Sequence, residues 1–172
     1  MTSSSNADPA HPFIIQDLYL TPHWRRLVAE WIYDAFWQTS NEVSADSLEQ
    51  RLSEAKMGTQ LPLSLLAQRH GQPIGTVNLV ENDDPARPHL RPWLAALYVV
   101  PSERSTGVGT ELVLELCKRA AQQDVDIVFL GTDNPGFYRR IGAEEVERAR
   151  QDLWVMRLNT SVGEESSWRS GL

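Results

Sequence analysis

The chain has 172 residues, 41% of them hydrophobic, which is enough for one compact domain with a sizeable core. Its net charge of −7 excludes the long basic surface that phosphate backbones require, so we expect no nucleic-acid partner. The longest apolar run, residues 93–100, is far shorter than the roughly 20 residues that span a bilayer, and we therefore expect no membrane segment.

The two ends of the chain differ in composition from the part between them. Residues 1–12 are rich in Ser, Asn, Asp and Pro, and residues 160–172 are rich in Ser, Gly and Glu. We expect flexible tails around a working domain at residues 13–159. The first residues resemble neither a signal peptide nor a transit segment, and the single cysteine, Cys117, cannot form an internal disulfide. Both features predict a cytoplasmic protein.

The domain is predicted to begin with a strand and two helices. Residues 13–20 are rich in β-forming side chains. Thr21 is a good N-cap and Pro22 suits the first position of a helix, so a helix should begin there. It carries one apolar stripe, formed by Trp24, Leu27, Val28, Trp31, Ile32, Ala35 and Phe36. A shorter helix is predicted over residues 44–57, with Gly58 as its terminator.

The middle of the domain is predicted to form the centre of a sheet. Residues 63–68 and 74–80 are strand-like runs on either side of a turn that contains Gly and Pro, so they should pair as an antiparallel hairpin. Residues 93–100 are almost continuously apolar, which is typical of a strand buried on both faces. We therefore expect this strand to lie centrally.

The remaining elements continue an alternation of strands and helices. The helix that follows Gly109 directs four apolar side chains inward, namely Leu112, Val113, Leu116 and Ala120. Residues 127–130 read as a second buried strand, residues 137–141 as a short helical turn, and residues 145–158 as a mostly extended closing segment. This order indicates an α/β fold or α+β sandwich in which the hairpin makes part of the sheet antiparallel.

A glycine turn, Arg104-x-x-Gly107-x-Gly109, lies between the apolar strand and the helix after it. Glycine lets the backbone approach a ligand closely, and a helix N-terminus offers unpaired N–H groups to an anion such as a pyrophosphate. Leu112 stands where the dinucleotide fingerprint requires a third small residue, and the chain has no Gly-Lys-Ser or Gly-Lys-Thr. NAD, ATP and GTP are therefore disfavoured. Alternatively, the two glycines only relieve strain in a helix-capping turn.

With its neighbours, this turn resembles the GNAT superfamily of acyl-CoA-dependent N-acyltransferases. The family hallmark, Arg/Gln-x-x-Gly-x-Gly/Ala, is met by Arg104, Gly107 and Gly109. Residues 92–101 are similar to the family's strand before the pyrophosphate loop, and residues 136–142 to its Phe-Tyr-x-x-x-Gly element. The resemblance covers about residues 61–145. It implies a mixed central sheet of about six or seven strands, about four flanking helices, and two central parallel strands that splay apart.

The resemblance also implies an activity and a binding site. The activity is direct transfer of an acetyl group from acetyl-CoA, a co-substrate, to a primary amine of an unidentified small molecule or peptide. The pantetheine arm would pair with the backbone of one splayed strand, and the loop would hold the pyrophosphate. The residues so implied are Leu97, Tyr98, Val99, Arg104, Ser105, Thr106, Gly107, Val108, Gly109, Thr110 and, for a polar contact to the arm, Asn134. Homodimers are frequent in the family, and the sequence leaves the oligomeric state open.

Tyr138 matches the family's tyrosine that protonates the leaving CoA thiolate. A phenol is a weak acid that can supply one proton, which suits this role. Alternatively, Tyr138 is an aromatic residue that packs the short helix onto the sheet. The general base is not assigned, because the strand at residues 93–100 has no carboxylate. The open alternatives are a water chain or one of five side chains, namely Asp34, Glu42, Glu81, Asp83 and His89.

Other chemistries find little support in the sequence. The histidines are scattered without the spacing of a metal site, so none is predicted. Cys117 lies mid-helix without an activating neighbour, which favours direct transfer over an acyl-cysteine. Trp37 and Trp93 either shape an acceptor pocket or belong to the core. Two other functions use the same fold: an acyl-CoA-binding sensor without catalysis, and a protein-interaction module.

Overall fold

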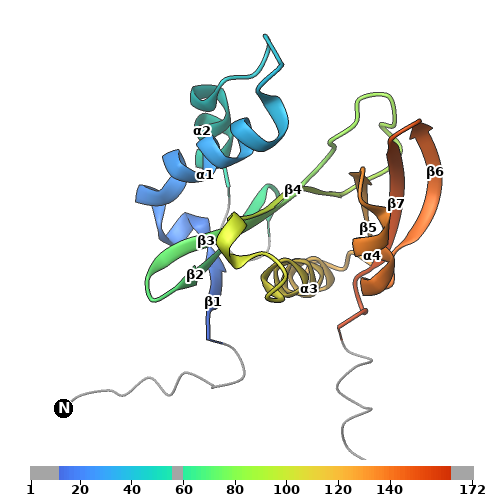
Figure 1. Cartoon of the computed structure of the whole chain (residues 1–172). Helices are drawn as coiled ribbons and strands as arrows, with labels where there is room; N and C mark the ends of the chain where they lie inside the picture. The colour runs from blue at the N-terminus through green and yellow to red at the C-terminus, as the bar shows by residue number, and fades with distance from the viewer. Residues whose placement is uncertain (1–11, 56–59, 164–172) are drawn as a thin grey trace, which may run out of the picture.

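The computed structural model describes residues 12–55 and 60–163, so Gly58 lies outside the described residues. A seven-stranded sheet in the order β1-β2-β3-β4-β5-β7-β6 forms its centre (Figure 1). Only the β4–β5 pair is parallel, which confirms the mixed sheet. The strands are β1 (Ile14–Asp17), β2 (Leu63–Arg69), β3 (Gln72–Val80), β4 (Trp93–Val99), β5 (Ile127–Thr132), β6 (Glu144–Arg150) and β7 (Leu153–Asn159).

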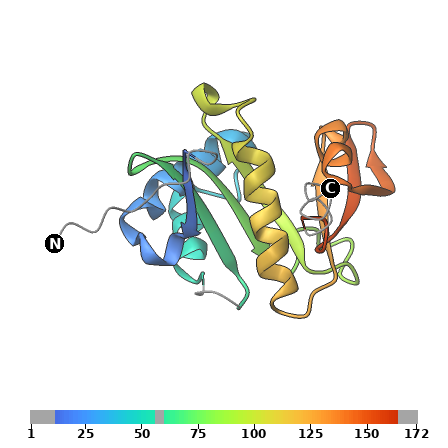
Figure 2. The ribbon, with the colours of Figure 1, turned by 90° about the horizontal axis from the view of Figure 1, so that it is seen from below.

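Helices cover both faces of the sheet. The α-helix α3 runs across one face, whereas α1 and α2 lie on the other (Figure 2). Successive side chains of β2 point to opposite faces of the sheet and so pack against both helical layers. Leu65 packs with α3, and the next residue, Leu66, packs with α1 and α2. The helical segments are η1 (Leu18–Leu20), η2 (Pro22–Trp24), α1 (Arg25–Ile32), η3 (Tyr33–Trp37), α2 (Ala45–Ser53), η4 (Pro101–Glu103), α3 (Val108–Ala121) and α4 (Pro135–Ile141).

The first predicted helix is present but is not one regular α-helix. Pro22 begins a 3₁₀ turn, α1 follows, and η3 is a π-helical turn. Thr21 makes no side-chain cap, and its buried hydroxyl has no partner among the described residues. The predicted stripe holds for Val28 and Ile32, which are buried, but is wrong at Ala35 and Phe36, which are exposed. The wider π turn breaks the 3.6-residue period and carries Phe36 out of the core.

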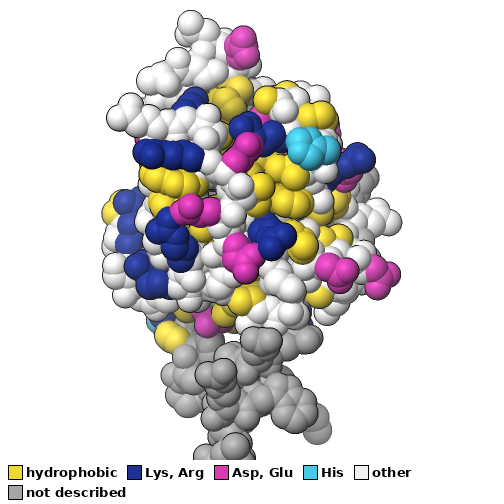
Figure 3. Space-filling view, turned by 90° about the vertical axis from the view of Figure 1, so that its right-hand side faces the viewer, with side chains coloured by type: hydrophobic (Ala, Val, Ile, Leu, Met, Phe, Trp, Pro, Cys, Tyr) yellow, Lys and Arg dark blue, Asp and Glu magenta, His cyan; other side chains and the backbone are white. Residues whose placement is uncertain are grey.

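The edge strand β6 is mostly charged. Glutamates and arginines dominate it, and three of its glutamates pair with arginines elsewhere: Glu144 with Arg157, Glu145 with Arg139, and Glu147 with Arg87. Basic and acidic side chains accordingly lie among hydrophobic ones on the side of the molecule that carries β6 and β7 (Figure 3). Charged edge strands resist pairing with other chains, so this end of the sheet is protected.

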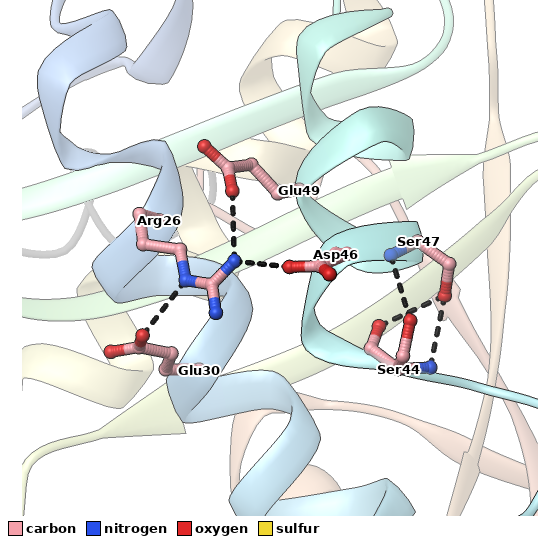
Figure 4. Close-up of polar contacts among 6 residues, drawn as sticks. All are labelled: Arg26, Glu30, Ser44, Asp46, Ser47 and Glu49. Carbon is pink, nitrogen blue, oxygen red and sulfur yellow. Dashed lines mark hydrogen bonds and ion pairs between the residues drawn. The ribbon is translucent and has the colours of Figure 1, made fainter.

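The second predicted helix is present as α2, which ends at Ser53 and is therefore shorter than predicted, and its start is a capping box (Figure 4). The Ser47 N–H donates to Ser44 Oγ at 3.1 Å, and the Ser44 N–H donates to Ser47 Oγ at 3.0 Å. Arg26 of α1 also faces Glu30, Asp46 and Glu49 there, but these groups are exposed and stabilise the fold little.

Removal of this cap should destabilise the protein measurably. Ser44→Ala leaves the Ser47 N–H without its acceptor, and we expect a loss of about 1 kcal/mol in the free energy of unfolding. Urea titration of the variant measures it. Ser102→Ala is the matched control, because that exposed serine makes no side-chain hydrogen bond with the described residues. Equal stability of the two variants would contradict the role of the cap.

The two central parallel strands diverge after their first contact. Trp93 opposite Phe129 is their one register pair, whereas β5 pairs with β7 along its full length. A bulge in β4 accompanies the divergence: Ala95 lies opposite Asn78 and Tyr98 opposite Thr76, so two residues of β4 face one of β3. Only the first three residues of β4 are buried. The prediction of a strand buried on both faces is therefore wrong for its second half, which borders a cavity.

Candidate functional site

A cavity of about 1210 Å³ opens where β4 and β5 diverge. Its walls come from η3, the loop between β3 and β4, β4 itself, the turn before α3, the end of β5, and α4. β4 supplies Leu94, Ala95, Ala96, Leu97 and Val99. Ala96 holds a φ of +50°, a strained value for a residue with a side chain, and such strain is common at functional sites.

The sequence predicts twelve residues that bind the co-substrate or take part in catalysis. Nine of them line this one cavity. They are Leu97, Val99, Arg104, Ser105, Gly107, Gly109, Thr110, Asn134 and Tyr138. They come from three separate parts of the chain: the end of β4, the turn before α3, and the segment from β5 into α4. The fold therefore brings together residues that the sequence could relate only by resemblance.

The side chains of the other three expected residues point elsewhere. Tyr98 lies on the opposite face of β4, where its ring is 5.4 Å from that of Trp31. The Thr106 hydroxyl donates to the carbonyl of Glu103 at 2.5 Å. Val108 is almost completely buried beneath the turn. Any contact of these residues with a ligand in the cavity must therefore use the backbone.

The glycine turn has the backbone conformation that its sequence requires. Gly107 caps α3 with a φ of +91°, and a Cβ there would meet nothing within 4 Å. Ser105 holds a φ of +61°, so a serine stands where glycine would be unstrained. A Cβ on Gly109 would lie 3.4 Å from the Phe137 ring and would occupy space at the cavity wall.

Side-chain contacts hold the turn in place. Arg104 Nε donates to the carbonyl of Val99 at 2.9 Å, which ties the turn to the end of β4. Glu103 accepts from Arg69 Nε at 3.1 Å and Nη2 at 3.0 Å, which ties η4 to β2. The first turn of α3 lacks intrahelical acceptors for its N–H groups, and Arg104 and Arg140 also line the cavity. This end of the cavity is therefore suited to an anion.

Tyr138 of α4 combines burial with a position on the cavity wall. Its side chain is 7% exposed, and its ring meets that of Phe137 edge-to-face at a centroid distance of 4.9 Å. Burial raises the pKa of the phenol, and the charge of Asp133 raises it further. The phenol thus keeps its proton at neutral pH. Tyr138 also belongs to the hydrophobic core cluster with residues of α3 and the sheet, so the same side chain packs the helix.

Of the five side chains left open as a base, only Asp83 lines the cavity. Glu81 instead pairs with Arg91 at 3.3 Å on the surface. Asp83 keeps an exposed surface, yet the surrounding walls partly desolvate its carboxyl. This burial, with a smaller contribution from Asp84 and an opposing one from Arg51, raises the pKa of Asp83 to about 6. A carboxyl with such a pKa exchanges protons readily near neutral pH.

The raised pKa of Asp83 predicts how the stability of the protein depends on pH. Because the folded state binds the proton more tightly than an ordinary carboxyl with pKa 3.8, ionisation of Asp83 costs stability as pH rises from about 4 to about 6. We expect Asp83→Asn to melt at a higher temperature than the native protein at pH 7.5, with the difference shrinking towards pH 4.5. Thermal melts at both pH values measure it. Asp152→Asn, at the exposed rim, is the control, and an equal shift there would contradict the assignment.

Sequence reasoning missed or left open several members of the site. Phe36 was expected in the core but lines the cavity, and Trp37 does so as well. Trp93 is a core residue, 2% exposed, whose indole N–H donates to the carbonyl of Leu90 at 2.6 Å. Residues 133, 140, 150 and 152 also reach the cavity, and no local signal in the sequence marks them.

Neither a metal-binding cluster nor a membrane-spanning helix is present among the described residues. Within residues 12–55 and 60–163, no three His, Cys, Asp or Glu side chains gather where they could hold a metal ion. None of the helices in these ranges combines the length and apolar composition needed to cross a membrane. Cys117 is 1% exposed, and burial raises the pKa of its thiol to about 12. It is a packing residue of the core.

Solved structures with the same fold are N-acetyltransferases. An aminoglycoside 6'-N-acetyltransferase complexed with coenzyme A superposes with a TM-score of 0.67 at 16% identity, over 86% of this chain and 97% of that one. The aminoglycoside 6'-N-acetyltransferase from Enterococcus faecium gives 0.65 at 17% identity, over 86% and 97%. The spermidine N-acetyltransferase chimera from Vibrio cholerae and hSSAT gives 0.63 at 16% identity, over 88% and 97%. No curated protein sequence matches the chain.

The fold is therefore that of the acyl-CoA-dependent N-acetyltransferases. The chain itself belongs to the acetyltransferase (GNAT) family, whose sequence pattern matches residues 28–143. The family transfers an acetyl group from acetyl-CoA, and the end of the cavity beside the glycine turn is suited to an anion such as a pyrophosphate. Family membership and fold agree with the prediction made from the glycine turn and its two neighbouring motifs.

Proposed function

We propose that this protein transfers an acetyl group from acetyl-CoA directly to a primary amine. The observation that carries the proposal is the cavity between the diverging strands β4 and β5. The glycine turn borders the cavity, and the buried phenol of Tyr138 lies on its wall. The solved structures of similar fold act on amines, namely aminoglycosides and spermidine, which supports an amine acceptor here.

The chain offers a specific group for each part of acetyl-CoA. The backbone N–H groups of residues 104–110 would hold the pyrophosphate, because this turn opens the N-terminus of α3 onto the cavity. The unpaired side of β4 at Leu97, Tyr98 and Val99 would hydrogen-bond the pantetheine arm. Asn134, at the start of α4, would contact the same arm.

Two side chains on the cavity wall would donate or accept the protons of the reaction. Tyr138 would give its phenolic proton to the departing thiolate, for which a protonated, buried phenol is suited. Asp83 would take a proton from the amine, because only the neutral amine can attack a thioester. No nucleophilic residue of the protein is needed, and the buried Cys117 lies outside the cavity lining.

Calorimetric titration followed by a thiol assay tests this function. We expect the purified protein to bind acetyl-CoA but not NAD or ATP, and to release CoA thiol when a primary amine is added. Binding without thiol release from any amine would instead indicate an acyl-CoA sensor. Failure to bind acetyl-CoA would overturn the proposal and leave a protein-interaction module on the same fold.

We also propose the cellular compartment in which the reaction takes place. The described part of the chain keeps its one cysteine as a buried free thiol. A single unpaired thiol suits a reducing environment, and we therefore place the reaction in the cytoplasm.

A further inference from the structure

We propose that the acceptor is a singly charged primary amine attached to an apolar group, with its ammonium at Asp83 and its apolar part against Phe36 and Trp37. This inference rests on the proposed acetyl transfer to an amine. It narrows the acceptor to one chemical class and assigns three side chains of this chain to its recognition.

The first support is an aromatic wall that the fold leaves exposed. Phe36 is 50% and Trp37 37% exposed, and both line the cavity. The other large hydrophobic side chains that are exposed in the described structure, such as Tyr19 and Val146, lie outside the cavity lining. Because the π turn η3 takes Phe36 out of the helix stripe, the aromatic pair faces the cavity at the expense of core packing. An apolar ligand group would cover this surface and recover the lost burial.

The second support is a carboxylate that has no direct partner. Among the described residues Asp83 makes no hydrogen bond or salt bridge, and the charge of Arg51 favours its ionised form only from a distance. In contrast, Glu103 of the same cavity is held by Arg69, and Asp152 at the rim lies 4.0 Å from Arg150. A partly desolvated carboxylate without a direct partner gains from a single cation that enters the cavity.

The overall charge of the lining argues against a polycation. Four carboxylates line the cavity, at positions 83, 103, 133 and 152, together with three arginines, at positions 104, 140 and 150. With Arg69 on Glu103 included, the acidic and basic charges balance, so the lining has no excess of carboxylates for the several ammonium groups of a polycation. Specificity of this kind comes as much from repulsion as from attraction.

Topology separates the acceptor end of the cavity from the co-substrate end. Val80 pairs with Trp93, so the loop that carries Asp83 lies beside the beginning of β4. The glycine turn follows the end of the same strand. An amine held at Asp83 and a pyrophosphate held at the turn would therefore approach from opposite ends of β4, and their reacting groups would meet between them.

The protons and electrons balance with these groups. Asp83 takes one proton from the ammonium, and the neutral nitrogen forms a bond to the acyl carbon while the carbon–sulfur bond breaks. The electron pair of that bond stays on sulfur, which takes the Tyr138 proton. The nitrogen loses its second proton, which restores the phenol, and Asp83 releases its own proton to water.

Steady-state assays of thiol release at saturating acetyl-CoA test the acceptor class. The probes are 2-phenylethylamine, which is apolar with one charge, ethanolamine, which lacks the apolar group, and spermidine, which is a polycation. We expect kcat/KM for 2-phenylethylamine to exceed that of either other amine by roughly tenfold or more, since covering one aromatic-sized apolar group is worth at least that factor. Preference for spermidine or ethanolamine would overturn the inference while leaving acetyl transfer intact.

Variants connect this preference to the named residues. Trp37→Ala and Phe36→Ala should each lower kcat/KM for 2-phenylethylamine by roughly tenfold, through KM, with KM for acetyl-CoA unchanged. Asp83→Asn should weaken calorimetric binding of 2-phenylethylamine to the protein saturated with CoA. Tyr19→Ala, an exposed aromatic outside the cavity lining, is the control and should change neither value. Equal losses for all three amines in Trp37→Ala would refute the role of the aromatic wall. Binding of acetyl-CoA without transfer to any amine would refute the proposed function itself.

Discussion

Tyr138→Phe is expected to lower kcat by roughly ten to ten-thousandfold, the usual range for loss of a positioned acid. The substitution removes one hydroxyl from a side chain that is 7% exposed and keeps the edge-to-face contact with Phe137. The fold and the Kd for acetyl-CoA should therefore not change. The burial that raises the phenol pKa also keeps the acid protonated, so native activity should persist on the alkaline side of neutrality.

Single-turnover and steady-state assays measure the loss in kcat, and calorimetric titration measures the Kd for acetyl-CoA. Tyr19→Phe is the matched control, because Tyr19 is an exposed tyrosine outside the cavity lining and the same atom is removed. If Tyr138→Phe retained full kcat, Tyr138 would be left with its packing role alone. A loss of acetyl-CoA affinity equal to the loss in kcat would show that the hydroxyl serves binding and not proton transfer.

Gly107→Val is expected to abolish measurable binding of acetyl-CoA while leaving a folded protein. The φ of +91° at this position strains any L-residue, and a branched side chain would stand on the surface where phosphate oxygens must approach the backbone. The structure offers a control with the same strain. Gly71, in the hairpin turn between β2 and β3, has a φ of +74° and likewise open space around its missing Cβ.

Comparison of the two glycine variants separates strain from ligand contact. Gly71→Val should lose similar stability, about 1–2 kcal/mol for a left-handed residue, but should bind acetyl-CoA normally because it lies outside the cavity lining. Thermal melts and calorimetric titration of both variants give the two quantities. Normal affinity in folded Gly107→Val would remove the turn from the binding site.

The sequence predicted the elements whose signals are local. Apolar runs bounded by Gly and Pro marked β2, β3 and β4, and Ser44 marked the start of α2. The glycine turn combined a local conformational need with a motif, and it lies where the resemblance implied. Alternation along β4 could also have separated Tyr98 from Leu97 and Val99, since neighbouring side chains in a strand point to opposite faces.

Other features of the site have no local signal. The stripe on the first helix has the period of a regular α-helix, and nothing in its pattern marks the π turn that exposes Phe36. Asp83 stands in a polar loop among similar acids, so only the tertiary structure distinguishes it from Glu81 and Asp84. The divergence of β4 and β5 arises from long-range pairing, because β5 is drawn along its full length to β7 instead.

This divergence gives the sheet two internal edges besides its outer ones. Open edges with unpaired N–H and C=O groups are the usual templates for aggregation and strand exchange between molecules. Here the edges of β4 and β5 face each other across a cavity that is closed on its flanks by the glycine turn and α4. A cavity of this size admits a narrow, extended ligand and excludes another β-sheet. The unpaired backbone N–H and C=O groups of β4 and β5 therefore remain available to one small ligand but are not exposed to other protein chains.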